Sequence, residues 1–216
     1  MKTQFRNRTE AGEFLARKIE QYANRTDVLV LALPRGGVPV GFVVAQRLRV
    51  PLDVLVVRKL GVPRYEELAF GALASGGVRV LNSEIVDSLA ISPATIAMIA
   101  AREPRELDRR EQLFRDDRPA HPVRDRTMIL VDDKSATGAT MRAAIQSLRS
   151  RCARRIVVAA STIAACTYRE MRGEADEIFA VLTPEEFYGV SQWIEDFAQT
   201  TEEEVRNLLE TAAQLG

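Results

Sequence analysis

Short runs of apolar, often β-branched residues recur along this chain and alternate with longer segments of helical period. The runs have the length of strands, and they cover residues 28–33, 53–57, 128–131, 156–160 and 178–182. Strands that are apolar along their whole length are buried on both faces, as in a parallel sheet covered by helices. Helices are predicted between the strands, at residues 38–48, 140–149 and 167–173. The sequence therefore predicts an α/β protein with a mostly parallel central sheet flanked by helices.

Two more helices are predicted from their start signals. Ser92-Pro93 suits the N-cap and the first helical position, and this helix is expected to continue to about Phe114. A polar loop, 115–126, should follow it. A capping-box pattern at 201–204 should begin a last helix that runs through Leu209.

The strongest functional pattern lies where the apolar run 128–131 ends. Asp132 and Asp133 follow the run, and a turn of mostly small residues then leads into a helix. In a parallel sheet this strand end lies at the edge where ligands bind, and free amide groups at a helix N-terminus favour phosphate. The candidate ligand-binding residues of this turn are Lys134, Ser135, Ala136, Thr137, Gly138, Ala139 and Thr140.

The two carboxylates can accept hydrogen bonds from adjacent hydroxyl groups, such as those of a ribose. They repel each other unless a cation or donor lies near, so Mg²⁺ is the expected cofactor, bound by Asp132 and Asp133 directly or through water. A phosphate turn beside such a site describes a phosphorylated sugar. The plainer alternative is a strand-to-helix turn whose acids merely suit the helix dipole.

The segment 128–141 resembles the ribose-phosphate signature of type I phosphoribosyltransferases, which has a strand, two acids, two variable residues, Ala/Thr-Thr-Gly, a small residue and Thr. The resemblance implies the fold of that family, with 5-phosphoribosyl pyrophosphate or a nucleoside monophosphate as ligand. In hypoxanthine-guanine members an Asp precedes the motif's Thr-Gly. Ala136 stands there in this chain, so that purine chemistry is disfavoured.

Two further segments resemble the family's pyrophosphate site. Arg35, Gly36 and Gly37 follow the first apolar run, and glycine backbones can turn amide groups toward an anion. Arg58 and Lys59 follow the second run and would form a second positive pole for pyrophosphate. The plainer alternatives are an ordinary glycine turn and a solvated loop.

The remaining parts of the chain resemble the family's lid and hood. Residues 64–73 look like the mobile loop that covers the site, and Glu67 on this loop is a candidate general base. The expected arrangement is one domain, 1–216, with a core of about 25–182 and a small hood from about 1–24 and 183–216.

The predicted function is transfer of ribose 5-phosphate to a nitrogen acceptor, a nucleobase by expectation, with release of pyrophosphate. Asp132, Asp133 and Glu67 are the catalytic candidates. One alternative is a regulatory protein that binds nucleotide without catalysis, since Lys134 stands where related sequences carry a small or apolar residue. Another alternative is hydrolysis of a phosphorylated sugar or nucleotide.

Charge and cysteine usage restrict the partners. Lys and Arg total 30, as do Asp and Glu, so the chain has no basic excess to attract nucleic acid or an anionic membrane. The two cysteines lack metal-ligand spacing, and the first residues lack a signal-peptide core. A cytoplasmic protein is expected, with a homodimer as one oligomeric state open to it. His121, the only histidine, is expected at the surface without a role.

Overall fold

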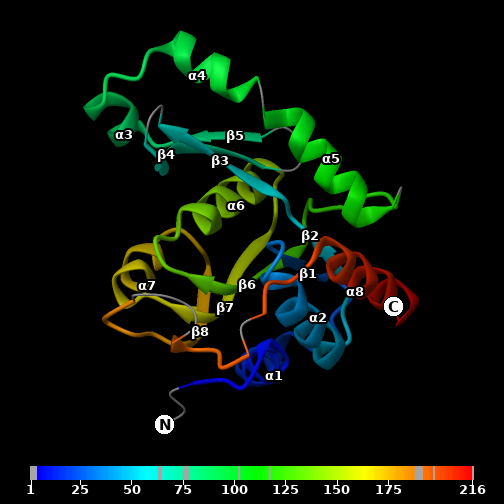
Figure 1. Ribbon diagram of the computed structural model, residues 1–216. Coiled ribbons are helices and arrows are strands. Elements are labelled where there is room, and N and C mark those ends of the chain that lie inside the picture. Colours follow the sequence, from blue (N-terminus) through cyan, green and yellow to red (C-terminus); the bar gives the residue numbers. More distant parts are fainter. Residues whose placement is uncertain are drawn as a thin grey trace.

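A computed structural model describes residues 4–62, 65–74, 78–101, 103–116, 118–187, 192–196 and 198–215. Its centre is a five-stranded sheet in the order β2-β1-β6-β7-β8, in which every neighbouring pair is parallel (Figure 1). The strands are β1 (Val28–Ala32), β2 (Leu52–Val54), β6 (Thr127–Ser135), β7 (Arg155–Ile163) and β8 (Glu177–Leu182). Each overlaps a predicted apolar run, so the predicted parallel sheet is confirmed, although the strand predicted at 53–57 ends at Val54.

Helices cover both faces of this sheet (Figure 1). Alternate residues of β6 show the division, because Ile129 and Val131 belong to one core cluster while Met128 and Leu130 belong to the other. The first cluster includes residues of α1 (Arg8–Lys18), η1 (Glu20–Tyr22), α2 (Gly37–Leu48) and α8 (Glu202–Leu215), and the second includes residues of α6 (Ala139–Ser150) and α7 (Ala165–Met171).

A second, antiparallel sheet consists of β3 (Val57–Val62), β4 (Tyr65–Ala74) and β5 (Val78–Leu81). The expectation of a loop at 64–73 is therefore wrong for residues 65–73, which belong to the ten-residue strand β4. The reason is burial, because Phe70, Ala72 and Ala74 of β4 are all nearly inaccessible. Residues 63–64 lie outside the described part of the chain.

Three helices follow this sheet along the chain and lie over it in Figure 1: α3 (Ser83–Ser88), α4 (Pro93–Ala100) and α5 (Glu103–Arg115). Ser92 caps α4 as predicted, accepting a hydrogen bond from the Thr95 amide at 3.1 Å. The prediction of one continuous helix to Phe114 is wrong. Pro104 accounts for the break, because proline is tolerated in the first turn of a helix and disrupts a helix interior.

The N-terminal and C-terminal segments pair with each other beside β8. Phe5 and Ile194 form an isolated β-bridge, and the Phe5 amide donates to the Trp193 carbonyl at 2.8 Å. Phe5, Ala11 and Ile194 form a small buried cluster against residues of β8. α8 lies apart from this pairing and packs on α2 and α5.

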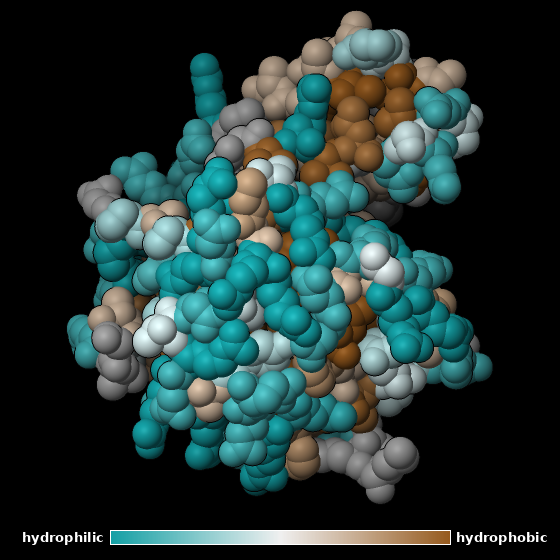
Figure 2. Space-filling model, turned by 180° about the vertical axis from the view of Figure 1, so that it is seen from behind, coloured by the Kyte–Doolittle hydropathy of each residue, from teal (hydrophilic) through white to brown (hydrophobic). Residues whose placement is uncertain are grey.

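The capping box of α8 is confirmed, since Thr201 Oγ1 accepts a hydrogen bond from the Glu204 amide at 3.0 Å. The helix extends beyond the predicted Leu209 to Leu215. None of the described helices has the length and apolar character that crossing a membrane requires. Figure 2 shows apolar side chains gathered at the end of the molecule that carries α3 and α4, where Leu81, Leu89 and Met98 are exposed.

Candidate functional site

The loops after β1 and β6 meet at the carboxyl ends of these adjacent strands. The Leu33 amide donates to the Val131 carbonyl at 2.9 Å, which fixes the first loop beside the second. A Cβ atom at Gly36 would lie 2.2 Å from Asp133 Oδ2, and one at Gly37 would lie 2.7 Å from the Val131 carbonyl oxygen. Only residues without a side chain allow this approach, so the sequence of the first loop determines how closely it packs against the acids.

Asp132 and Asp133 both lie against the first loop, since a Cβ at Gly37 would be 3.3 Å from Asp132 Oδ1 and one at Gly36 would be 2.2 Å from Asp133 Oδ2. Asp133 is buried, and its Oδ2 accepts a hydrogen bond from Arg8 Nε at 3.0 Å. Arg8 belongs to α1, and its side chain is only 10% exposed. The Asp133 carboxylate therefore has a protein cation beside it, which the sequence did not reveal because Arg8 is 125 residues away.

Asp132 has a different environment. Its Oδ1 accepts a hydrogen bond from the Asp133 amide at 2.8 Å. Burial, and then the charge of Asp133, raise the pKa of Asp132 well above its usual range, while the charge of Lys134 opposes this shift. The half-buried Lys134 thus stabilises the ionised form of Asp132.

The turn after β6 is open to solvent. Ala136 and Thr137 are exposed, and Gly138 adopts a left-handed conformation with φ of 73° at the N-cap of α6. Side chains of the neighbouring helices fix the turn. Thr167 Oγ1 of α7 donates to the Ala136 carbonyl, and Arg142 Nη1 of α6 donates to the Thr137 carbonyl at 2.9 Å. Two exposed residues, Ala136 and Thr137, therefore lie just before the start of α6.

The candidate cations lie on two sides of this turn. Lys59, on β3, lines a cavity of about 530 Å³ together with Thr137 and Ala139 of the turn. Arg35 lies in the loop after β1 and is half-buried, and its side chain has no hydrogen-bond or ion-pair partner among the described residues. Arg58 is half-buried on β3. The structure thus brings Lys59 to the phosphate turn, and Arg35 to the neighbouring loop.

The other predicted site residues belong to β6, α6 and β4. Ser135 is buried at the end of β6, while Ala139 and Thr140 begin α6. The backbone of Glu67 belongs to β4, and its side chain lies outside the described part of the structure. Of the C-terminal stretch proposed as part of the hood, residues 188–191 and 197 also lie outside it.

The donor set suits Mg²⁺ only as an ion shared with a ligand. The described residues contain no group of three or more His, Cys, Asp or Glu side chains placed to hold a metal. Asp132 and Asp133 can offer two carboxylates, and Mg²⁺ is commonly bound by one or two carboxylates together with substrate phosphates and water. The residues present therefore fit such an ion.

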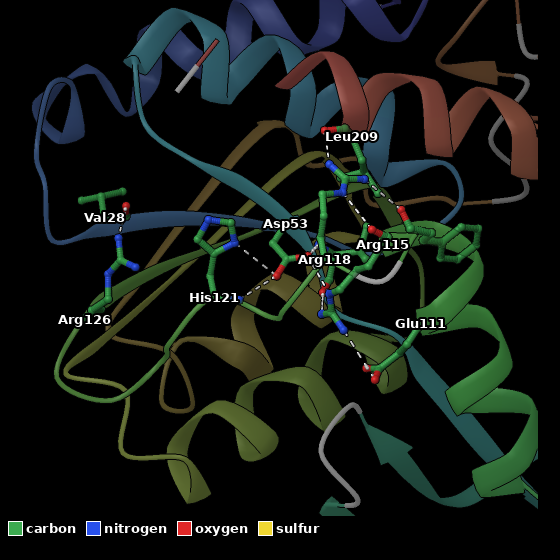
Figure 3. A network of polar contacts seen from close by, with 10 residues as sticks. Val28, Asp53, Glu111, Arg115, Arg118, His121, Arg126 and Leu209 are labelled. Atoms are coloured by element: carbon green, nitrogen blue, oxygen red, sulfur yellow. Dashed lines mark hydrogen bonds and ion pairs between the residues drawn. The ribbon is translucent and has the colours of Figure 1, made fainter. Parts of the chain in front are cut away.

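A second polar cluster surrounds Asp53 of β2 (Figure 3). Asp53 is nearly inaccessible, and its Oδ1 accepts a hydrogen bond from Arg115 Nε at 2.9 Å. The His121 amide donates to Asp53 Oδ2 at 3.2 Å, and Arg118 Nη1 donates to the Leu209 carbonyl at 2.9 Å. Burial would raise the pKa of Asp53, but the hydrogen bond from His121 and the charge of Arg115 outweigh burial and lower it to about 2.

This cluster joins β2, α5, the loop before β6 and α8. His121 is exposed as expected, and its amide and ring both contact Asp53. The one feature of the sequence that pointed to this cluster is Asp53, a charged residue among apolar neighbours.

Comparison with known proteins identifies relatives over most of the chain. The family model of the phosphoribosyl transferase domain matches residues 3–192. A protein of Mycobacterium tuberculosis named "Putative phosphoribosyl transferase" is 43% identical over 208 residues, which are 96% of this chain and 47% of the relative. The chain thus spans about half the length of the curated relatives it matches.

Solved structures resemble the chain over nearly its whole length. The crystal structure of TT1426 from Thermus thermophilus has 35% sequence identity and a TM-score of 0.84, with 95% of this chain and 97% of that one covered. A hypothetical protein from Neisseria gonorrhoeae with bound ppGpp has 14% identity and a TM-score of 0.51, with 98% of each chain covered. The second likeness shows the fold alone.

Proposed function

Because the chain belongs to the phosphoribosyl transferase domain family, we propose that it transfers ribose 5-phosphate from 5-phosphoribosyl pyrophosphate to a nitrogen acceptor and releases pyrophosphate. One observation carries this proposal. The loop of Arg35, Gly36 and Gly37 packs directly against the acid pair, whose strand leads into the open turn at the start of α6. A ligand at this edge would meet two carboxylates that accept hydrogen bonds from hydroxyl groups, a turn that binds phosphate, and the cation of Arg35.

The acids and the turn would hold the sugar. Amide groups at the start of α6, with the hydroxyl groups of Thr137 and Thr140, would bind the 5-phosphate. Asp132 and Asp133 would accept hydrogen bonds from the ribose hydroxyls. As the bond to the leaving group breaks, the sugar becomes positively charged, and two carboxylates would stabilise that charge more than the neutral ground state.

The cations would act on the leaving group. Arg35 and Lys59 would neutralise charge on pyrophosphate from two sides of the site. Mg²⁺, when bound with the ligand by Asp132 and Asp133, would supply further neutralisation of the phosphate oxygens. Glu67, whose backbone belongs to β4, is the proposed general base toward the acceptor.

The test is a transfer assay on the purified chain. The protein is incubated with 5-phosphoribosyl pyrophosphate, Mg²⁺ and one nucleobase at a time, and pyrophosphate and nucleotide are both measured. Release of pyrophosphate that depends on one base, and is lost in Asp132→Asn, is the expected result. Pyrophosphate release without any base would indicate hydrolysis and contradict transfer.

A second candidate is a regulatory protein that binds the same ligands without catalysis. The charge of Lys134 favours it, because a fixed ammonium beside Asp132 supplies charge that could not follow departing pyrophosphate. Tight calorimetric binding of 5-phosphoribosyl pyrophosphate, with no turnover for any base, would support this candidate over transfer.

A further inference from the structure

We propose that Arg8 is a positioning residue for the ribose hydroxyls, which acts by orienting Asp133 and by tying the C-terminal segment to the acid pair. This inference rests on the proposed function. Arg8 lies in the first turn of α1, 125 positions before Asp133 in the sequence.

Contacts of Arg8 bridge separate parts of the chain. Its Nε donates to Asp133 Oδ2 at 3.0 Å, and its Nη1 donates to the Ala198 carbonyl at 2.7 Å. The Arg8 and Asp133 side chains are 10% and 4% exposed. An ion pair shielded from solvent in this way restricts the carboxylate far more than a surface pair would.

The pair leaves a defined set of oxygens for a ligand. Asp133 Oδ2 is engaged by Arg8, and Asp132 Oδ1 is engaged by the Asp133 amide. Asp132 Oδ2 and Asp133 Oδ1 accept no hydrogen bond from the residues that the structure describes. Two acceptor oxygens on adjacent residues match two adjacent hydroxyl groups, so the ligand feature that Arg8 serves is the diol rather than a phosphate.

The hydrogen bond from Arg8 to the Ala198 carbonyl links the orientation of Asp133 to the C-terminal segment. Ala198 follows the segment that pairs with Phe5, where the Glu195 amide donates to the Phe5 carbonyl at 2.9 Å. Arg8 is therefore clamped between the paired terminal segments and the acid pair. Displacement of Ala198 would remove a contact that fixes the Arg8 guanidinium.

Gly36 adds a second restraint on the same carboxylate, because Asp133 packs directly against Gly36, in the space that a Cβ of residue 36 would fill. With Arg8 removed, the carboxylate would lose its anchor on the α1 side and keep only this steric limit. Ribose binding would weaken, whereas a ligand without hydroxyl groups would be unaffected.

The experiment compares ribose 5-phosphate with inorganic pyrophosphate, by calorimetric titration of Arg8→Gln, Arg8→Lys and the wild type. Arg8→Gln should weaken ribose 5-phosphate about tenfold or more and change pyrophosphate affinity less than about twofold. Arg8→Lys keeps the charge but cannot bridge both partners with a planar fork, so it should recover only part of the loss. Arg47→Gln is the matched control, because it breaks an exposed ion pair between α2 and Glu13 of α1 at 2.8 Å.

The two ligands separate the possible outcomes. Equal losses for both ligands in Arg8→Gln and in Arg8→Lys would mean that Arg8 only supports the fold, and would overturn the inference. Unchanged binding of both ligands would overturn it as well. If Arg8→Gln fails to fold, Arg8→Lys decides by the same comparison of ligands. Failure of the wild type to bind ribose 5-phosphate would instead contradict the proposed function.

Discussion

Asp132 and Asp133 are adjacent in sequence and occupy unlike environments. Asp133 has the guanidinium of Arg8 beside it, whereas Asp132 has a raised pKa caused first by burial and then by the charge of its neighbour. The two acids are therefore not interchangeable. Replacement of Asp133 by Asn would leave a buried arginine without its carboxylate, and replacement of Asp132 would relieve repulsion.

Arg35 should discriminate between ligands. Arg35→Ala is expected to weaken 5-phosphoribosyl pyrophosphate much more than ribose 5-phosphate, because a charge-assisted contact contributes about 1.5–3 kcal/mol, or tenfold and upward in affinity. Calorimetric titration of both ligands measures the difference. Equal losses for the two ligands would remove Arg35 from the pyrophosphate site.

Lys134 should set how strongly binding depends on magnesium. Its charge favours ionised Asp132, so Lys134→Gly is expected to make ribose 5-phosphate binding more dependent on Mg²⁺. An interaction between partly exposed charges is worth at most about 1 kcal/mol, so the effect at low Mg²⁺ should be at most about fivefold. Titrations of binding against Mg²⁺ in wild type, Lys134→Gly and the charge-preserving Lys134→Arg test this. Superimposable curves would show that Lys134 has no part in binding.

At the scale of elements, the site depends on how closely two loops approach. The loop after β1 and the strand end of β6 are so close that the missing side chains of Gly36 and Gly37 are a structural requirement. The φ of Gly36 is −62°, a value that any residue adopts, so the requirement at that position is one of space rather than of backbone conformation.

Gly36→Ala tests this requirement. The added Cβ would lie 2.2 Å from Asp133 Oδ2, and Arg8 holds that carboxylate in place, so strain or loss of the ion pair should follow. Overpacking of this kind costs about 1–3 kcal/mol, and each kcal/mol lowers Tm by roughly 2–4 °C in a chain of this size. Thermal unfolding gives the result. Gly173→Ala is the control, because nothing lies within 4 Å of a Cβ there, and equal Tm values for the two variants would contradict the steric argument.

The sequence predicts the parallel sheet and the phosphate turn because both depend on residues that are close together in the sequence. Apolar runs identify the five strands, and the acids followed by small residues identify the turn at Thr137. The antiparallel sheet is different, because β4 passes through a stretch rich in alanine and glycine that has no strand period of its own. Its pairing with β3 and β5 determines its conformation, and the sequence shows no such pairing.

At the scale of the whole molecule, Asp53 connects parts of the fold that lie far apart in sequence. Its carboxylate contacts Arg115 of α5 and His121 of the following loop, and Arg118 beside it contacts α8 (Figure 3). Neither this cluster nor the contact of Arg8 could be predicted, because each joins residues separated by more than sixty positions.

Asp53 should make folding stability sensitive to acid. Its pKa is about 2 in the folded chain and 3.8 in the reference state, so the folded state favours the ionised form. The resulting stability is fully present above about pH 4 and is lost as pH falls from about 4 to about 2. It amounts to about 2 kcal/mol at about 1.4 kcal/mol per pKa unit.

Asp53→Asn should therefore lower the free energy of unfolding at pH 7 and flatten its dependence on pH between about 4 and 2. Urea unfolding at several pH values measures both effects. Asp87→Asn, which changes an exposed carboxylate on α3, is the control. An unchanged slope in Asp53→Asn would show that other groups govern acid unfolding.

The pairing of the terminal segments also has a consequence for biosynthesis. Arg8 is synthesised before its carbonyl partner, Ala198, which follows it 190 positions later. The sheet strands β1, β2, β6, β7 and β8 all precede that partner, so a nascent chain can form the sheet while its acid pair is still incompletely supported. Competence to bind a pentose phosphate would then appear only after the ribosome has passed Ala198.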